Sequence, residues 1–270
     1  MTRGPSVPAG QLRADLARLG LPTGGTVLVQ VSMRRIGWLD GGADALLDAL
    51  RDAIGPDGTV VTPTQTANNS TTTREFREAA RGLSAAGRQA LEDAIAGYEP
   101  AHSVSYRMGR FAEAVRTSPG AVRSGHPQTS FSAVGPDAQW LMAVHDQDSH
   151  LGERSPLARL YDIAATVVLI GRPFAFCTGF HLAEHRLAEP PRRRPYRCFV
   201  MIDAVRTTVD FIAPDLDDSD FGQLGDALGA SGAVTTGNVG YAATHVVSFR
   251  RAVDFAVTWM AANRPRTLLA

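Results

Sequence analysis

The sequence predicts an α/β protein with a mixed, largely parallel central sheet flanked by helices. Short β-branched apolar runs alternate with amphipathic segments of helical period. The strand-like run 26–31 is followed by a helical pattern over 43–53 and by a second strand-like run over 59–62. This β-α-β order predicts a parallel strand pair joined by a right-handed crossover. A third run, 166–171, has the length and composition of a buried central strand.

The remaining elements follow from residue spacing and turn residues. Leucines at helical intervals predict a first helix over 9–20 that ends at Gly20. Gly55-Pro-Asp-Gly58 is a strong turn signal after the second helix. Further along we predict a helix over 111–116, a strand over 131–135, helices over 136–144 and 157–161, a strand or hairpin over 197–212, a helix over 221–228, a strand over 245–249 and a helix over 252–262.

Residues 66–97 interrupt this pattern. A polar stretch leads into a segment over 74–96 that looks helical but has few large apolar residues. We interpret 66–97 as a helical and loop insertion near the active site, or a lid over it, although a solvated surface excursion has the same pattern. No internal repeat and no break in composition divides the chain, so we predict one domain over 1–270.

The composition excludes several classes of function. The chain has 27 basic and 27 acidic residues, and this balance argues against a general nucleic-acid surface. All 27 basic residues are arginine, which excludes a P-loop, Schiff-base or pyridoxal-phosphate lysine. The two cysteines, Cys177 and Cys198, form no C-x-x-C motif. Since no signal-peptide pattern and no apolar run of transmembrane length is present, we expect a cytoplasmic protein with no membrane partner.

The stretch Thr178-Gly-Phe-His-Leu-Ala-Glu-His185 follows the third strand-like run. It opens a helix predicted over 178–189, with Thr178 as N-cap, at the end of a strand where open α/β sheets bind ligands. His181 and Glu184 are three residues apart and share one helix face. A carboxylate so placed can hold the histidine in one tautomer, and the histidine can act as a base near neutral pH. An exposed helix start with an ordinary histidine and glutamate fits the same local pattern.

Other catalytic motifs compare less well with the sequence. Neither G-x-G-x-x-G nor G-x-S-x-G occurs, so a dinucleotide fold and an α/β-hydrolase are not supported. His181-Leu-Ala-Glu-His185 matches the H-x-x-E-H pattern of inverted zincins. Such enzymes need a further downstream carboxylate, usually glutamate, and no glutamate follows Glu189. A zinc hydrolase therefore stays as a minor alternative.

Short motifs occur in a fixed order along nearly the whole chain. They lie at 24–37, 41–50, 55–65, Tyr98-Glu-Pro, Met108-Gly109, 119–127, Ser130-Phe131, 152–157, 178–184, Asp220-Phe221 and 237–240. Together they resemble the aminoglycoside N(3)-acetyltransferase family, and only 66–97 and 190–214 match it loosely. The resemblance implies acetyl-CoA as donor, an aminoglycoside or other amino sugar as acceptor, and no metal. We also consider a homodimer.

The same resemblance implies roles for individual residues. The catalytic base falls on His181, and Glu184 orients it or binds the cationic substrate. Coenzyme A would contact Ser32, Met33, Arg34, Arg35, Gly37, Ser105, Met108, Gly109 and Thr178. The amine substrate would contact Gln65, His126, Glu184 and Asp220. Two alternatives stay open, a backbone-bonded loop histidine at His126 and a helix cap at Asp220.

Two positions depart from the family pattern. Gln30 stands where the family usually has histidine, and Ala175 stands where it usually has an acidic or amide residue. Loss of a carboxylate weakens the attraction for a polycation and removes one possible partner of His181. The alternatives are therefore acetylation of another small amine in biosynthesis and a catalytically impaired ligand-binding relative. Resistance and biosynthesis are both compatible with the sequence.

Overall fold

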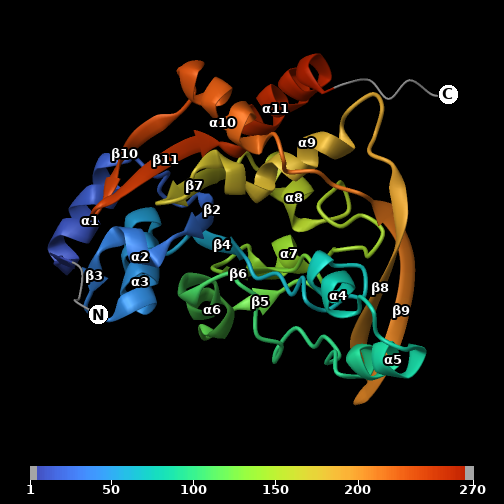
Figure 1. The fold of residues 1–270 in the computed structure, drawn as a ribbon. Helices are drawn as coiled ribbons and strands as arrows, with labels where there is room; N and C mark the ends of the chain where they lie inside the picture. Colours follow the sequence, from blue (N-terminus) through green and yellow to red (C-terminus); the bar gives the residue numbers. More distant parts are fainter. Residues whose placement is uncertain (1–4, 265–270) are drawn as a thin grey trace.

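A seven-stranded mixed sheet forms the centre of the protein in the computed structural model, which describes residues 5–264 (Figure 1). Its spatial order is β10-β11-β7-β2-β4-β6-β5. The strands are β2 (Thr26–Val31), β4 (Thr59–Pro63), β5 (Val122–Arg123), β6 (Phe131–Val134), β7 (Thr166–Ile170), β10 (Thr235–Val239) and β11 (Ala242–Ser248). Only the β7–β2 and β2–β4 pairs are parallel, and the four outer pairs are antiparallel. The mixed α/β class is confirmed, but its parallel part is confined to the three central strands.

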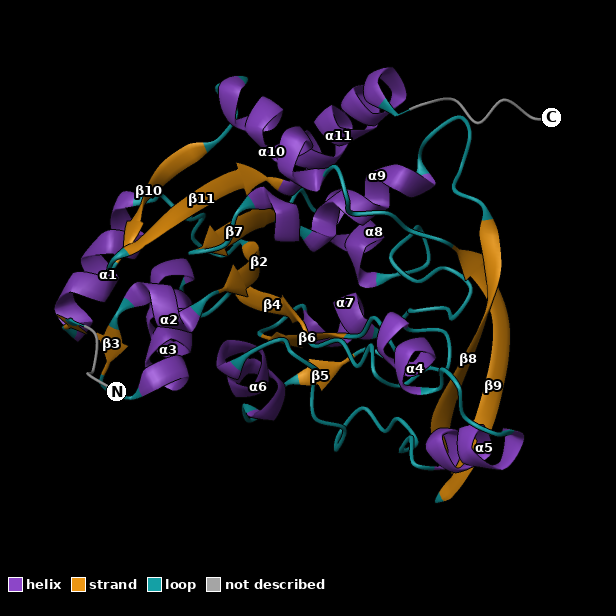
Figure 2. Cartoon of the chain, viewed as in Figure 1, coloured by secondary structure: helices purple, strands orange, loops and turns teal. Residues whose placement is uncertain are grey.

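Helices cover both faces of this sheet (Figure 2). They are α1 (Ala9–Arg18), α2 (Met33–Ile36), α3 (Gly42–Ile54), α4 (Arg74–Ala79), α5 (Ala85–Asp93), α6 (Arg110–Thr117), α7 (Ala138–Met142), α8 (Pro156–Asp162), α9 (His181–His185), α10 (Phe221–Ala230) and α11 (Phe249–Asn263), with 3-10 turns η1 (Phe174–Phe176) and η2 (Thr178–Phe180). A small parallel pair, β1 (Ser6–Val7) and β3 (Trp38–Leu39), lies outside the sheet. The predicted β-α-β unit of β2, α3 and β4 is confirmed.

The alternation of side chains along β2 divides the core into two layers. Val27, Val29 and Val31 pack in the cluster that contains the apolar faces of α1, α3 and α6. Leu28 points to the opposite face and packs in the cluster formed with α7, α8, α10 and α11. Successive residues of a strand face opposite sides, so a β-branched run buried on both sides fits a central strand.

A long antiparallel ribbon stands apart from the central sheet at one side of the molecule (Figure 2). It consists of β8 (Arg193–Ile202) and β9 (Val205–Pro214), each of ten residues. The turn uses Asp203 and Ala204, which have positive φ angles of 50° and 62°. The predicted strand or hairpin over 197–212 is therefore a hairpin, longer than its apolar pattern indicated.

Residues 66–97 pack against this ribbon rather than over the cavity described below. Their helical part divides into α4 and α5 because Gly82 adopts a φ of 77° and the Ser84 hydroxyl caps α5. From β9, Arg206 donates to the carbonyl oxygens of Ile95 and Glu92, both at 2.7 Å. Figure 1 shows α5 beside the ribbon. The segment is thus fixed to the ribbon by hydrogen bonds.

Within residues 5–264, no helix combines the length and apolar character that a membrane crossing requires.

Asn69 joins the insertion to the ribbon, and its loss is expected to destabilise the protein. Its amide nitrogen donates to Ala96 O and Phe199 O, and its amide oxygen accepts from Phe199 N, each at 2.8 Å. Asn69→Ala would leave the buried Phe199 N without a partner, at a cost of roughly 1–3 kcal/mol. Urea unfolding measures this cost. Asn263→Ala, an exposed asparagine bonded within its own helix, is the matched control. Equal midpoints for the two variants would contradict the assignment.

Candidate active site

A cavity of about 240 Å³ opens where the parallel strands β2 and β4 end. Its lining comes from these strand ends, from α6 and the loop before it, from the segment after β7 and from the start of α10. The lining residues are Gln30, Val31, Thr62, Pro63, Gln65, Met108, Phe111, Ala112, Arg172, Ala175, Phe176, Cys177, Thr178, His181, Asp218 and Phe221. This is the carboxyl edge of the parallel strands, where ligands bind in open α/β sheets.

His181 and Glu184 form a hydrogen-bonded pair at this cavity. His181 Nδ1 lies 2.6 Å from Glu184 Oε2, and their side chains are 15% and 1% exposed. The three-residue spacing on α9 therefore produces the predicted pair. The ring of Phe221 packs against the imidazole, with centroids 4.8 Å apart. Glu184 is enclosed, while His181 lines the cavity.

The second oxygen of Glu184 is bonded by two donors. Glu184 Oε1 accepts hydrogen bonds from Asp217 N at 3.0 Å and from Arg264 Nη1 at 2.7 Å. An ionised carboxylate accepts at both oxygens, so with the guanidinium at Oε1 it accepts from His181 Nδ1–H at Oε2. In that tautomer, Nε2 keeps its lone pair on the ring edge away from Glu184.

Gln30 at the end of β2 holds the turn before α9. Its amide nitrogen donates to Phe176 O at 2.6 Å and to Thr178 Oγ1 at 3.1 Å, and its amide oxygen accepts from Thr178 N at 3.0 Å. Thr178 is therefore not the predicted N-cap. The predicted helix over 178–189 is reduced to the turn η2 and the five residues of α9, and residues 186–189 are not helical.

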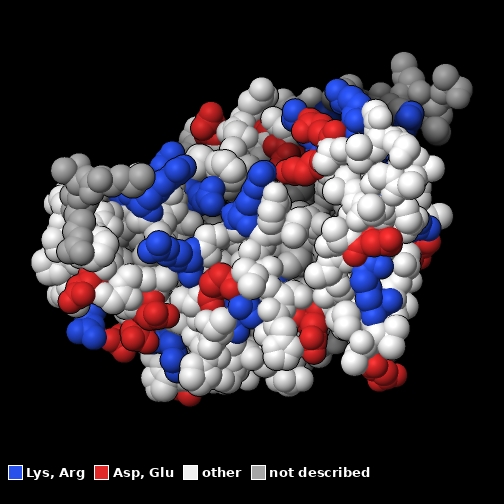
Figure 3. All heavy atoms as spheres, turned by 60° about the horizontal axis from the view of Figure 1, so that its bottom comes forward, with Lys and Arg blue, Asp and Glu red and all other residues white. Residues whose placement is uncertain are grey.

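Basic side chains lie beside the cavity. Burial lowers the pKa of Arg172, and the neighbouring charges of Arg34 and Arg35 lower it further. The guanidinium of Arg172 lies over the ring of Phe176 at 4.7 Å. On the face shown in Figure 3, a group of basic side chains lies together towards the upper left. Three arginines whose positive charges lie close enough to repel one another form a site that is suited to an anion.

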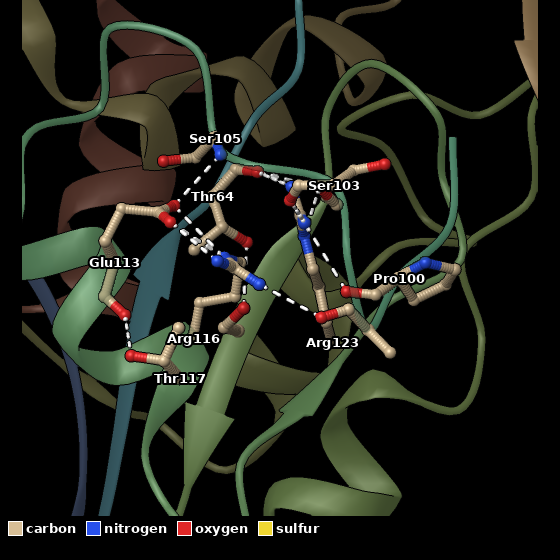
Figure 4. Close-up of polar contacts among 11 residues, drawn as sticks. Thr64, Pro100, Ser103, Ser105, Glu113, Arg116, Thr117 and Arg123 are labelled. Carbon is tan, nitrogen blue, oxygen red and sulfur yellow. Dashed lines mark hydrogen bonds and ion pairs between the residues drawn. The ribbon is translucent and has the colours of Figure 1, made fainter. Parts of the chain in front are cut away.

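A polar network holds the wall of the cavity that carries Met108 (Figure 4). Arg123 donates to the carbonyl oxygens of Ser103 and Thr64. Glu113 on α6 accepts from Ser105 N at 2.9 Å and from Arg116 Nη2 at 2.7 Å. Burial opposes ionisation of Glu113, but hydrogen bonds from Arg116 and Ser105 outweigh it and lower its pKa. The loop before α6 is thus anchored by charged groups on both sides.

The structure brings some predicted site residues to the cavity and separates others. His181, Thr178, Gln65 and Met108 line it. Arg35 lines an adjoining cavity of about 360 Å³ together with Arg172 and Tyr241. The other residues predicted to contact coenzyme A do not line either cavity; these are Ser32, Met33, Arg34, Gly37, Ser105 and Gly109.

Gly37 has a structural reason for its identity. It adopts a φ of 109°, and a Cβ there would lie 2.7 Å from Pro5 O. No other residue type fits this approach without displacing the backbone of the N-terminal segment.

His126 and Asp220, two predicted substrate contacts, have other partners. His126 is fully buried; its Nδ1 accepts from Gln128 N and Thr129 N, and its Nε2 faces Gln147 O at 3.1 Å. Both Asp220 oxygens bind Arg264, at 2.7 and 2.8 Å. In this structure His126 therefore supports its own loop, and Asp220 is part of the Glu184 network.

Arg172, Phe221 and Arg264 are site residues that the sequence reading missed. Arg172 stands two positions after β7. Its place at the carboxyl end of a predicted central strand could have indicated a ligand contact. Phe221 lies in the motif Asp220-Phe221, but it carries no polar group that would indicate a chemical role. Arg264 is 80 residues from Glu184, and no local pattern links them.

His185, the second histidine of the zincin-like pattern, faces away from the cavity. Its ring packs so closely on Gly152 that a Cβ at that glycine would lie 2.2 Å from Nδ1. Among residues 5–264, no group of three or more histidine, cysteine or acidic residues is placed to hold a metal ion. The spacing that resembles H-x-x-E-H therefore does not bring its two histidines to one point.

A buried histidine–glutamate pair at the carboxyl edge of a mixed α/β sheet, beside an arginine cluster, fits an enzyme that takes an anionic cosubstrate. The chain belongs to the aminoglycoside 3-N-acetyltransferase family, whose sequence model matches residues 28–261. It is 35% identical to aminoglycoside N(3)-acetyltransferase VII of Streptomyces paromomycinus, over 93% of this chain and 90% of that protein. The acetyltransferase class is therefore confirmed.

Solved structures agree with this assignment. The YokD protein of Bacillus subtilis superposes with a TM-score of 0.87 at 30% identity, covering 97% of this chain and 95% of that one. The acetyltransferase AAC-IIIb, solved with CoASH, gives a TM-score of 0.83 at 29% identity, covering 96% and 97%. AAC-VIa, solved with sisomicin, gives 0.83 at 29% identity, covering 96% and 98%.

The buried histidines predict a loss of stability in acid. Burial lowers the pKa of His126 to about 4 and that of His150 to about 2, and the two rings lie 4.7 Å apart. Unfolded histidine titrates near 6.5, so protons bind the unfolded chain first as the pH falls below that value. Between pH 7.5 and 5.0, each histidine is expected to remove about 2 kcal/mol from the free energy of unfolding.

Urea unfolding at the two pH values measures this loss. His126→Asn, whose amide does not titrate in this range but can accept the same backbone N–H groups, should lose part of the pH dependence. If His126→Asn kept the full pH dependence of the wild-type free energy of unfolding, His126 would be excluded as a source of that dependence.

Proposed function

We propose that this chain transfers an acetyl group from acetyl-CoA directly to an amino group of an aminoglycoside, with His181 as general base. It would act as a single domain over residues 1–270 in the cytoplasm. The observation that carries the proposal is the His181–Glu184 pair, 2.6 Å apart, at the cavity of a family member. Relatives solved with CoASH and with sisomicin support the two classes of ligand.

The geometry suits proton removal from an amine. An acceptor ammonium group first loses one proton to water. As its nitrogen bonds to the thioester carbonyl carbon, His181 Nε2 takes a second proton, directly or through water. The C–S bond then breaks, and the imidazolium returns its proton to the coenzyme A thiolate. Glu184 keeps Nδ1 protonated throughout and stabilises the transient imidazolium.

Thr178 is placed to assist at the carbonyl oxygen. Its hydroxyl oxygen accepts from Gln30 Nε2 at 3.1 Å, so its own proton can be donated into the cavity that it lines. A hydrogen-bond donor directed at the oxyanion stabilises the tetrahedral intermediate. Gln30 thus supports a competent site and does not favour the impaired-relative alternative.

Direct transfer is favoured over an acetylated enzyme. Cys177 is a nucleophile type that lines the cavity, but burial raises the pKa of its thiol to about 12. A neutral buried thiol is a poor nucleophile. The acetyl group would therefore pass to the amine in one complex with both substrates bound.

The arginine cluster provides a site for the phosphates of coenzyme A. Arg34, Arg35 and Arg172 repel one another in the absence of an anion, and a phosphate would relieve that repulsion through charge-assisted hydrogen bonds. The adjoining cavity with Arg35 and Arg172 extends this surface.

Acetylation of a less cationic small amine is a second candidate. Of the lining residues, Asp218 is the one carboxylate and Arg172 the one guanidinium, with Ala175 where the family usually has an acidic or amide side chain. A cavity whose lining charges cancel attracts a polycation less strongly than one with a further carboxylate. A panel of aminoglycosides and simple amino sugars, assayed by thiol release from acetyl-CoA, separates the candidates.

His181→Ala is expected to lower turnover by roughly 10²–10⁴-fold, the usual contribution of a general base. Thiol release with an acceptor found in the panel measures kcat, and isothermal titration measures coenzyme A binding. Binding should stay within a few-fold of the wild type because the arginine cluster is unchanged. Unaltered turnover would remove His181 from the mechanism.

Arg172→Ala is expected to raise the KM for acetyl-CoA roughly tenfold with little change in kcat, because one charged phosphate contact is lost. Arg88→Ala, an exposed arginine on α5, controls for a general loss of positive charge. The phosphate assignment fails if both variants keep the wild-type KM.

A further inference from the structure

Arg264 follows the last residue of α11, a helix that packs against α9 and η2. Its side chain is 19% exposed and reaches three separate groups. Nη1 donates to Glu184 Oε1 at 2.7 Å, Nε and Nη2 donate to Asp220 at 2.8 and 2.7 Å, and Nη2 also donates to Asp217 O at 2.8 Å. The planar fork of the guanidinium is well matched to such a set of acceptors.

These contacts act on His181 from two sides. Arg264 and the imidazole Nδ1 of His181 bond to the two oxygens of the same carboxylate, Glu184. Through Asp220, it fixes the residue before Phe221, whose ring packs on the imidazole at 4.8 Å. One cation therefore holds both the hydrogen-bond partner and the ring contact of the proposed base.

Glu184 depends on this cation for its charge. A carboxylate that is 1% exposed is costly to ionise unless it is paired and hydrogen-bonded. Without Arg264, Glu184 Oε1 would keep one donor, Asp217 N. The carboxyl group could then rotate or take up a proton, and its hold on the His181 tautomer would weaken.

We propose that Arg264 is a positioning residue for the acetyl transfer: it keeps Glu184 ionised and oriented so that His181 Nδ1 stays protonated and Nε2 stays available as the base. The inference rests on the proposed function, since it assumes that His181 is the base. It places a functional residue beyond 28–261, the range that the family model matches.

The test compares Arg264→Met, which keeps length but removes the charge, with Arg264→Lys, which keeps the charge but not the fork. Arg251→Met, an exposed arginine on the same helix, is the matched control. Arg264→Met should lower kcat roughly tenfold or more with a smaller change in KM, because proton transfer is affected more than binding. Arg264→Lys should recover part of this loss, and the control should match the wild type.

The pH profile separates positioning from a structural role. The charged and titratable groups around His181 are Glu184, Asp217, Asp218, Arg172, His185 and His150. When the charge of Arg264 is removed, Glu184 more readily takes up a proton, and the protonated imidazole loses its anionic partner. The acidic limb of kcat/KM should therefore move to lower pH in Arg264→Met and stay near the wild type in Arg264→Lys.

A double-mutant cycle keeps the test decisive if Arg264→Met folds poorly. Removing both charges of a buried pair is less destabilising than removing one. Arg264→Met combined with Glu184→Gln should lose little kcat beyond Glu184→Gln alone, because the proposed role of Arg264 passes through Glu184, whereas its contact with Asp220 only places the ring of Phe221. A further tenfold loss in the double variant, or a wild-type kcat and acidic limb in Arg264→Met, would overturn the inference.

His181→Ala distinguishes the two proposals. If it abolishes turnover while Arg264→Met behaves as wild type, only the role of Arg264 is lost. If His181→Ala retains turnover, the proposed mechanism itself is lost.

Discussion

The buried carboxylate of Glu184 is the constraint around which the site is built. An ionised group with almost no exposure needs donors on both oxygens, and they come from three elements: His181 on α9, Asp217 N before α10 and Arg264 after α11. Each donor lies on a different segment, so satisfying one charge fixes the relative positions of all three. The His181 ring is oriented because Glu184 is held by the other two donors.

The sheet supplies the other half of this constraint. β7, β2 and β4 are parallel and end at one edge, so the segments that follow them meet there. Gln30 at the end of β2 bonds to Phe176 O and to Thr178 of the turn that leads into α9. The sheet and the Glu184 network therefore hold the same short segment from opposite ends, and His181 lies between them.

Features encoded in local sequence were predictable, and features made by distant contacts were not. Periodicity gave the class, the β2-α3-β4 unit and the three-residue pairing of His181 with Glu184. Thr178 was wrongly predicted as a helix cap because its hydroxyl and N–H bond to Gln30, 148 residues away. Arg264 could not be inferred, since an arginine near a chain end has no local signature of pairing with a carboxylate 80 residues away.

The charges around the base also bear on the acceptor. Glu184 and Asp220 both form ion pairs with Arg264. Neither carboxylate is therefore available to bind an ammonium group independently. Under the proposed function, Asp218 and the neutral part of the cavity lining are then the groups left to contact the amine.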